Sequence, residues 1–235
     1  MKLNTNSNTY ILAYASLLVI AVAFVLAYCS QTLKPIQDKN VALDKKKQII
    51  AALNIRDVND NQVEEYYNKL VEADEIINEK NEVLSAGKPG GENDGFKLNG
   101  GDFKAGKLAL FVCNVDGQKK YVMPVYGMGL WGGISGYIAI NADKETIYGV
   151  YFNHEGETAG LGAEIKDNQK WQQQFCGKHL FADGNQDAVA LSVCKKVDNP
   201  ATQVDGVSGA TLTCDGVTRM IHEGLGKYLV FLKDK

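Results

Sequence analysis

The sequence of 235 residues has none of the patterns that mark a metal centre or a nucleic-acid surface. Its five cysteines include no Cys-x-x-Cys pair and no spacing typical of zinc or iron-sulfur sites. The 25 basic residues are dispersed and the formal net charge is −3, so we predict no nucleic-acid partner. No serine or cysteine nucleophile motif is present either. We therefore predict no metal ligand and no catalytic side chain.

The few cysteines leave two interpretations open. In an oxidising compartment, the four that follow Cys29 allow three disulfide connectivities. A domain of roughly 200 residues, however, buries enough surface to fold without a cross-link. Buried free thiols are therefore favoured, with a disulfide as the alternative.

Charge is missing altogether between Thr9 and Thr32. The apolar core from Tyr10 to Tyr28 is long enough to cross the ~30 Å hydrocarbon layer as a helix, with a tyrosine at each interface. A cleaved signal peptide has a shorter apolar region followed by a small-x-small site, so an uncleaved anchor in membrane lipid is favoured. We predict an N-terminal tail over residues 1–9 and a transmembrane helix over 10–30. The flanking charges leave the orientation open.

A helical stalk or subdomain is predicted over residues 31–95, before a larger domain over 96–235. Apolar residues at helical spacing indicate two amphipathic helices between Gln37 and Leu84, interrupted at residues 59–61. Asn61 and Glu64 have the spacing of a capping box for the second helix. A glycine-rich loop then ends the stalk before the larger domain begins.

The larger domain has the pattern of strands joined in hairpins. Strands are predicted at 108–115, 119–125, 136–141 and 146–152, with Asp116-Gly117 as a hairpin turn. A helix over 165–175, a strand over 188–194 and a closing helix over 212–232, broken by Gly224 and Gly226, follow. We therefore predict an α+β fold, an antiparallel sheet with flanking helices, preceded by one N-terminal transmembrane helix.

Small residues and hydroxyls gather in the segment 205–213, just before the predicted closing helix. Glycines let backbone N–H groups approach a phosphate, and a helix N-terminus supplies unpaired donors and a positive dipole end. On physical grounds alone, a simple N-cap role for Ser208 or Thr211 is the favoured interpretation. The run Asp-Gly-Val-Ser-Gly-Ala-Thr nevertheless resembles the motif at which a flavin transferase esterifies threonine with FMN. That resemblance makes Thr211, and not Thr213, the acceptor, with Ser208, Gly209 and Ala210 shaping the phosphate turn.

Two further segments are ambiguous when taken alone. Residues 127–136 are rich in glycine around Leu130 and Trp131, which suits either a structural connection or an approach to a flat ring. Residues 154–162 combine a histidine, two glutamates and a glycine turn, and a polar loop is the favoured interpretation.

Taken in order, the apolar span, these two segments and the threonine motif resemble the C subunits of sodium-translocating NADH:quinone oxidoreductases. One departure is Ala159, where many relatives have proline. The resemblance implies covalent FMN as cofactor and an electron relay from NADH toward quinone, in company with other subunits and after the action of a flavin transferase. It also implies a bacterial inner-membrane location, with the FMN-binding domain on the periplasmic side. The residues that it implies around the ring are Leu130, Trp131, His154, Glu157, Thr158, Gly160 and Leu161.

The sequence is compatible with two rival functions. The G subunit of the related Rnf electron-transport complex shares the flavin-binding domain. A non-redox, membrane-anchored binding domain would use the same glycine loops to recognise a ligand, with Thr211 as a helix cap.

Overall fold

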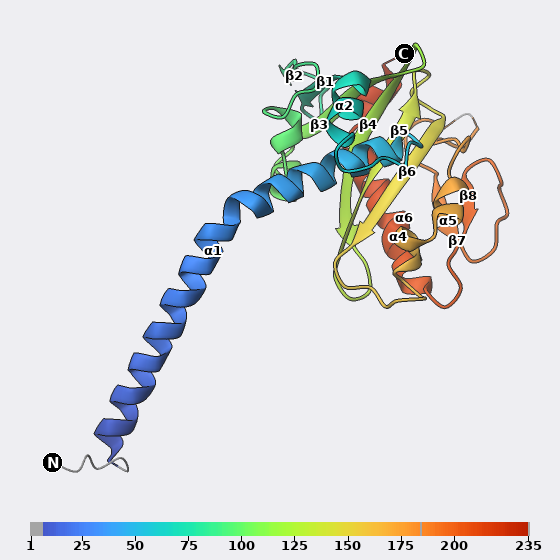
Figure 1. The fold of residues 1–235 in the computed structure, drawn as a ribbon. Helices are drawn as coiled ribbons and strands as arrows, with labels where there is room; N and C mark the ends of the chain where they lie inside the picture. Colours follow the sequence, from blue (N-terminus) through green and yellow to red (C-terminus); the bar gives the residue numbers. More distant parts are fainter. Residues whose placement is uncertain (1–6, 184, 235) are drawn as a thin grey trace. The chain divides into compact units, whose positions relative to one another are not determined.

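The structure is a computed structural model that describes residues 7–183 and 185–234 (Figure 1). It divides between Asp44 and Lys45 into two compact units. Most of the expected N-terminal tail, residues 1–6, lies outside the described residues.

The first unit consists of most of helix α1, which runs from Asn8 to Ala52 without a break. Among the described residues, α1 is the one helix long and apolar enough to cross a membrane, and none of its most apolar 18-residue window is buried. The sequence suggested a membrane helix and a separate stalk helix from Gln37. The structure joins them, and Pro35 is accommodated inside α1.

Within the described part of the second unit, an antiparallel sheet has the strand order β2-β1-β3-β4-β5-β6. Its strands are β1 (Val71–Ile77), β2 (Val83–Ser85), β3 (Leu108–Val115), β4 (Gln118–Met128), β5 (Gly133–Asn141) and β6 (Ile147–His154). The hairpin turn between β3 and β4 has Asp116 at φ 51° and Gly117 at φ 78°, as the Asp-Gly pair predicts. A separate parallel pair joins β7 (Ser192–Cys194) and β8 (Gln203–Asp205).

Two details of the predicted stalk helices were wrong. Helix α2 covers only Val63–Leu70, and Val71–Ile77 forms a strand, because β1 pairs along its length with β3. Gln62 is the N-cap of α2 and makes no side-chain capping bond, so the capping box at Asn61 does not form. The segment 45–95 belongs to the same compact unit as the residues that follow it.

Helices cover both faces of the sheet (Figure 1). Helix α6 (Thr211–Gly226) crosses one face and packs on β4, while α2 and residues 45–52 of α1 lie on the other. The helix expected over 165–175 is split into α4 (Glu164–Asp167) and α5 (Gln169–Gln173), and α7 (Leu229–Lys233) follows α6 after a short break. The remaining short helices are η1 (Gly95–Lys97) and α3 (Gly100–Lys104). Strand β7 is shorter than the strand expected over 188–194.

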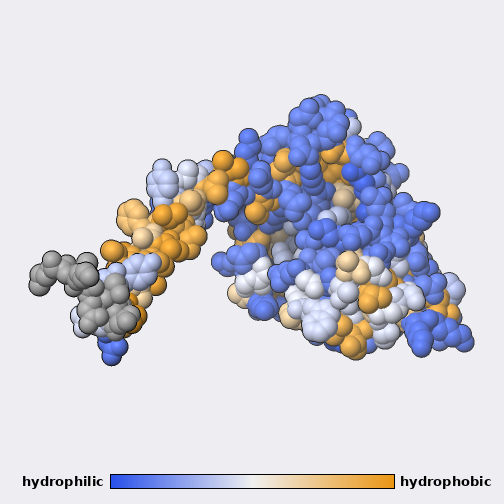
Figure 2. Space-filling view, turned by 60° about the horizontal axis from the view of Figure 1, so that its bottom comes forward, coloured by the Kyte–Doolittle hydropathy of each residue, from blue (hydrophilic) through white to orange (hydrophobic). Residues whose placement is uncertain are grey.

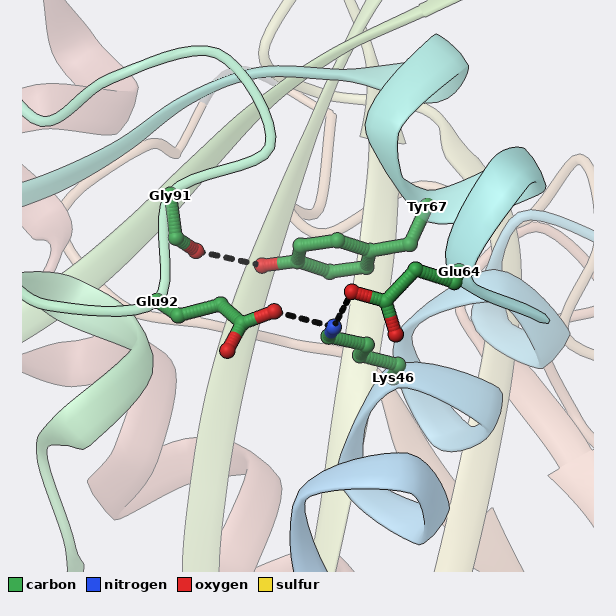
Figure 3. Close-up of polar contacts among 5 residues, drawn as sticks. All are labelled: Lys46, Glu64, Tyr67, Gly91 and Glu92. Atoms are coloured by element: carbon green, nitrogen blue, oxygen red, sulfur yellow. Dashed lines mark hydrogen bonds and ion pairs between the residues drawn. The ribbon is translucent and has the colours of Figure 1, made fainter. Parts of the chain in front are cut away.

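A buried lysine fastens the last turns of α1 to the rest of the second unit (Figure 3). The side chain of Lys46 is only 3% exposed, and its Nζ forms ion pairs with Glu64 at 2.9 Å and with Glu92. Tyr67 lies beside this group and donates from its hydroxyl to the carbonyl of Gly91 at 3.1 Å. A buried charge is tolerated only when it is paired. Lys46 therefore ties the end of α1, α2 and the loop before η1 together.

Candidate functional site

Three segments far apart in the sequence meet at one end of the sheet. They are the loop between β4 and β5, the segment that follows β6, and the start of α6 (lower end of the sheet in Figure 1). They line a cavity of about 200 Å³. Its lining residues are Leu130, Trp131, Glu157, Thr158, Leu161, Gly162, Gly209, Ala210, Thr211, Leu212 and Thr213. All three segments singled out in the sequence therefore contribute to one site.

The carboxylate of Glu157 connects the three segments. Its Oε1 accepts a hydrogen bond from the backbone N–H of Trp131 at 2.9 Å, and its Oε2 accepts one from the hydroxyl of Thr213 at 2.6 Å. Glu157 is 8% exposed. Burial alone would raise its pKa, but hydrogen bonds from Thr213 and from the backbone of Trp131, Leu130 and Gly132 outweigh burial and lower the pKa below its ordinary value. Glu157 is therefore an ionised carboxylate inside the protein.

Two glycines make room for this carboxylate. A Cβ added to Gly162 would lie 2.5 Å from Oε2 of Glu157 and 2.7 Å from the hydroxyl oxygen of Thr213. A Cβ added to Gly129 would collide with Oε1 of Glu157 and would lie 3.0 Å from its Cδ. No side chain fits at either position without displacing the carboxylate. Glycine is therefore needed at both positions because the carboxylate of Glu157 occupies the space of a side chain, and not because of the backbone conformation.

Helix α6 begins in the cavity without a side-chain cap. Its N-cap residue is Ala210, and Thr211 is the first helical residue. The interpretation of Ser208 or Thr211 as a simple N-cap is therefore wrong, and the unpaired N–H groups of the first turn remain available to an anion. Thr211 is exposed, whereas Thr213 is buried and donates to Glu157. Of the two threonines, only Thr211 presents its hydroxyl to a reagent outside the protein.

Large apolar side chains surround the cavity at the protein surface. Trp131 is 69% exposed, Leu212 58%, Leu130 47% and Leu161 42%. In Figure 2, which turns the lower end of Figure 1 toward the viewer, white and orange residues gather on this end among hydrophilic ones. Clustered exposed apolar side chains are characteristic of a surface that a ligand or a partner covers.

The remaining residues predicted for the site lie around the cavity and do not line it. His154 ends β6, and its Nδ1 accepts a hydrogen bond from the backbone N–H of Glu157 at 3.2 Å, so it orients the glutamate. Gly160 has a φ of 73°, and Gly209, which does line the cavity, has a φ of 76°; both are left-handed turns for which glycine is suited. Ser208 is exposed in the turn before α6.

Sequence reasoning missed Gly162, Leu212 and Thr213 as lining residues. Leu212 and Thr213 directly follow Thr211, and this adjacency to the threonine motif is the signal that could have indicated them. The bond between Thr213 and Glu157 joins residues 56 apart in the chain, which no local pattern indicates.

A larger cavity of about 520 Å³ lies between α6, β4 and β5. It is lined by Phe103, Tyr126, Met128, Ile134, Glu155 and Arg219 among others, and by none of the residues predicted for the site. We assign the candidate site to the smaller cavity because it contains the exposed hydroxyl and the uncapped helix terminus.

The residues of the smaller cavity suit a phosphate that carries a flat apolar ring. The start of α6 supplies N–H donors for a phosphate. Leu130, Trp131 and Leu161 supply apolar area at the cavity mouth for an aromatic system. A flavin mononucleotide has both a phosphate and a flat ring. Because of its size, part of the ring would extend beyond the 200 Å³ cavity.

Comparisons with known proteins support FMN as the cofactor. A family model for an FMN-binding domain matches residues 129–226, which contain the whole candidate site. The C subunit of the Na⁺-translocating NADH-quinone reductase from Haemophilus ducreyi is 31% identical, over 99% of this chain and 97% of the relative. Its counterpart from Pasteurella multocida is also 31% identical, over 92% and 91% of the two chains.

Solved structures give the same result for the fold. The crystal structure of the counterpart from Parabacteroides distasonis superposes with a TM-score of 0.78 at 36% identity, covering 86% of this chain and 98% of that chain. The Shewanella oneidensis NqrC structure superposes with a TM-score of 0.65 at 27% identity, covering 83% and 100%. The predicted α+β fold with its antiparallel sheet is thereby confirmed.

Proposed function

The chain belongs to the family of C subunits of Na⁺-translocating NADH-quinone reductases, and on that premise we propose that it carries FMN covalently on Thr211 and relays electrons. The family relation and the FMN-binding domain support a subunit of an oxidoreductase complex. The attachment point, the relay and the sodium coupling are the steps that we propose beyond that.

The observation that carries the proposal is the contrast between two threonines at one helix start. Thr211 is exposed beside an uncapped helix N-terminus, while Thr213 is buried and engaged by Glu157. Attachment requires that the threonine oxygen replace a leaving group on the phosphorus of an activated flavin nucleotide, with the hydroxyl proton leaving alongside that group. Only an exposed hydroxyl can enter the active site of a flavin transferase. Geometry therefore favours Thr211.

The residues of the cavity then have separate tasks. The first-turn N–H groups of α6 hold the phosphate, and the turn at Ser208, Gly209 and Ala210 brings the backbone close to it. Leu130, Trp131, Thr158 and Leu161 hold the ring, and Glu157 and His154 fix the loops that carry them. FMN, when bound, supplies the one-electron and two-electron redox chemistry that no side chain of the site can provide.

The place of the domain in the complex follows from the anchor. We propose that α1 crosses a bacterial inner membrane once, with the N-terminus inside and the FMN-binding domain on the periplasmic side. Electrons that start on NADH in another subunit would pass through this flavin toward quinone, while sodium is moved elsewhere in the complex. The apolar residues exposed around the cavity suit contact with such neighbouring subunits.

The proposal is tested by producing the full chain together with a flavin transferase and examining denatured protein by electrophoresis. The band should fluoresce under ultraviolet light, because a covalent flavin survives denaturation. Thr211→Ala should remove the fluorescence completely. A wild-type band without fluorescence would contradict the proposal.

The matched control is Thr211→Ser, which keeps a hydroxyl at the same exposed position. It should leave the fluorescent band in place. If Thr211→Ala retained the label, the attachment point would be wrong although the cofactor would be right.

A further inference from the structure

We propose that Glu157 is a positioning residue whose ionised carboxylate also sets the reduction potential of the flavin. The inference rests on the proposed function, because it concerns the flavin held in the same cavity. It goes further in naming the group that tunes that flavin. It also assigns a task to the one carboxylate on which all three segments of the site converge.

The wall of the cavity carries the charge of Glu157. Among the described residues that line the cavity, Glu157 is the only one with a charged side chain, and no lysine or arginine faces it there. The remaining lining residues are apolar, hydroxylic or glycine. His154 accepts a hydrogen bond at Nδ1 from the backbone of Glu157, so that nitrogen carries no proton. No cation of the cavity lining therefore compensates the carboxylate.

The same charge is poorly screened. Glu157 is 8% exposed, and its two oxygens are held by the backbone of Trp131 and by the hydroxyl of Thr213. Charges inside a protein interact more strongly than charges in water, because the surroundings polarise less. A fixed negative charge in the cavity wall is therefore felt by any group that occupies the cavity.

Reduction is the step on which this charge acts. Full reduction follows FMN + 2e⁻ + 2H⁺ → FMNH₂, and an electron that arrives ahead of its proton makes the ring more negative. A neighbouring carboxylate opposes that added charge, so it lowers the reduction potential of the flavin. Glu157 should thus make the bound flavin a stronger reductant than the same cofactor without it.

Glutamine is the informative replacement. The amide oxygen of Glu157→Gln can still accept from the N–H of Trp131, and the hydroxyl of Thr213 can rotate to accept from the amide nitrogen. The variant therefore removes the charge while preserving the contacts that hold the loops. A role confined to loop structure would leave the potential unchanged in this variant.

Glu155 offers a matched control two residues away. Its carboxylate accepts a hydrogen bond from the N–H of Gly133 at 3.2 Å. Glu155 lines the larger cavity and not the smaller cavity of the candidate site. Glu155→Gln removes the same amount of charge from the same segment. Thr213→Val is a second control, since it removes one hydrogen bond to Glu157 and leaves the charge in place.

The experiment is a redox titration of the full-length flavinylated chain in detergent, with thermal unfolding of each variant as a check on folding. Glu157→Gln should shift the midpoint potential to more positive values, by clearly more than either control. An unchanged potential in folded, flavin-loaded Glu157→Gln would overturn the proposal. An equal shift in Glu155→Gln would also overturn it, because the effect would then be a general field of the protein.

Loss of the flavin from Glu157→Gln is resolved by Glu157→Asp, which keeps the charge. Flavin retention and a wild-type potential in the aspartate variant would support the proposal. If both variants lost the flavin, attachment would instead require the glutamate side chain with both its length and its charge, and the proposal would be refuted. Failure of the proposed function is recognised separately, since the wild-type chain itself would then carry no flavin.

Discussion

Replacing Gly162 by alanine should disrupt the candidate site from within. The added Cβ would lie 2.5 Å from Oε2 of Glu157 and 2.7 Å from the hydroxyl oxygen of Thr213. Those two oxygens are already 2.6 Å apart in a hydrogen bond, so neither can withdraw without breaking it. Gly162 is buried, and its φ lies outside the left-handed region. The damage should therefore be steric and should fall directly on the Glu157–Thr213 bond.

Gly162→Ala should lower the free energy of unfolding in two ways. Overpacking of a dense interior costs about 1–3 kcal/mol, and a hydrogen bond to a charged group contributes about 1.5–3 kcal/mol. The two ranges add to about 2.5–6 kcal/mol, and a total near 4 kcal/mol corresponds to a fall in Tm of roughly 8–16 °C for a domain of this size. Thermal unfolding of the full chain in detergent, followed by circular dichroism, measures this fall in Tm. The flavin content of the purified variant should also fall, because the loops of the cavity lose their shared contact with Glu157.

Gly156→Ala is the control for this experiment. Gly156 lies in the same segment, is exposed, and a Cβ added there would meet nothing within 4 Å. Its Tm and flavin content should match those of the wild type. Equal effects of the two substitutions, or a Gly162→Ala chain as stable as the wild type, would refute the steric argument and the central place given to Glu157.

Two further predictions concern the end of α1. Lys46→Met should lower the free energy of unfolding by only about 1 kcal/mol, because the carboxylates of Glu64 and Glu92 are 62% and 42% exposed and can be hydrated when they lose their partner. The double variant Glu64→Gln/Glu92→Gln should lower it by about 3–5 kcal/mol, because it leaves the buried ammonium group of Lys46 without a charged partner. Denaturant unfolding compares them, and the opposite order would contradict the argument. Burial, partly offset by Asp102, lowers the pKa of Lys45 from 10.5 to about 8. The unfolded chain therefore holds more protons on Lys45 between these values, and the contribution of Lys45 to stability should rise as the pH is raised from 8 toward 10.5. The difference in unfolding free energy between the wild type and Lys45→Met should therefore change in favour of the wild type over this interval in the same unfolding measurement.

The fold was predictable from the sequence wherever local signals agreed with tertiary packing. The Asp116-Gly117 turn and the two strands that it joins are an example, because the turn residues and the apolar runs on either side of them point to the same hairpin. Val71–Ile77 shows the opposite case. Its apolar residues suit helical and extended structure alike, and pairing with β3 decides for the strand. Asn168 likewise splits one expected helix, since its side chain caps α5 by accepting from the N–H of Trp171.

The candidate site was predictable as a set of segments but not as a geometry. The threonine motif and the two glycine-containing segments were visible in the sequence, and the structure brings them to one cavity. What holds them there was not visible. The bonds of Glu157 to Trp131 and Thr213 span 26 and 56 residues, and the need for glycine at positions 129 and 162 follows only from the place of that carboxylate.

The proposed bond between Thr211 and a flavin phosphate is open to direct measurement. Full-length protein made together with a flavin transferase should be digested and its peptides sequenced by tandem mass spectrometry. We expect one peptide whose mass is increased by FMN less one water, with fragments that place the addition on Thr211. An unmodified peptide, or an addition located on Ser208 or Thr213, would contradict the assignment.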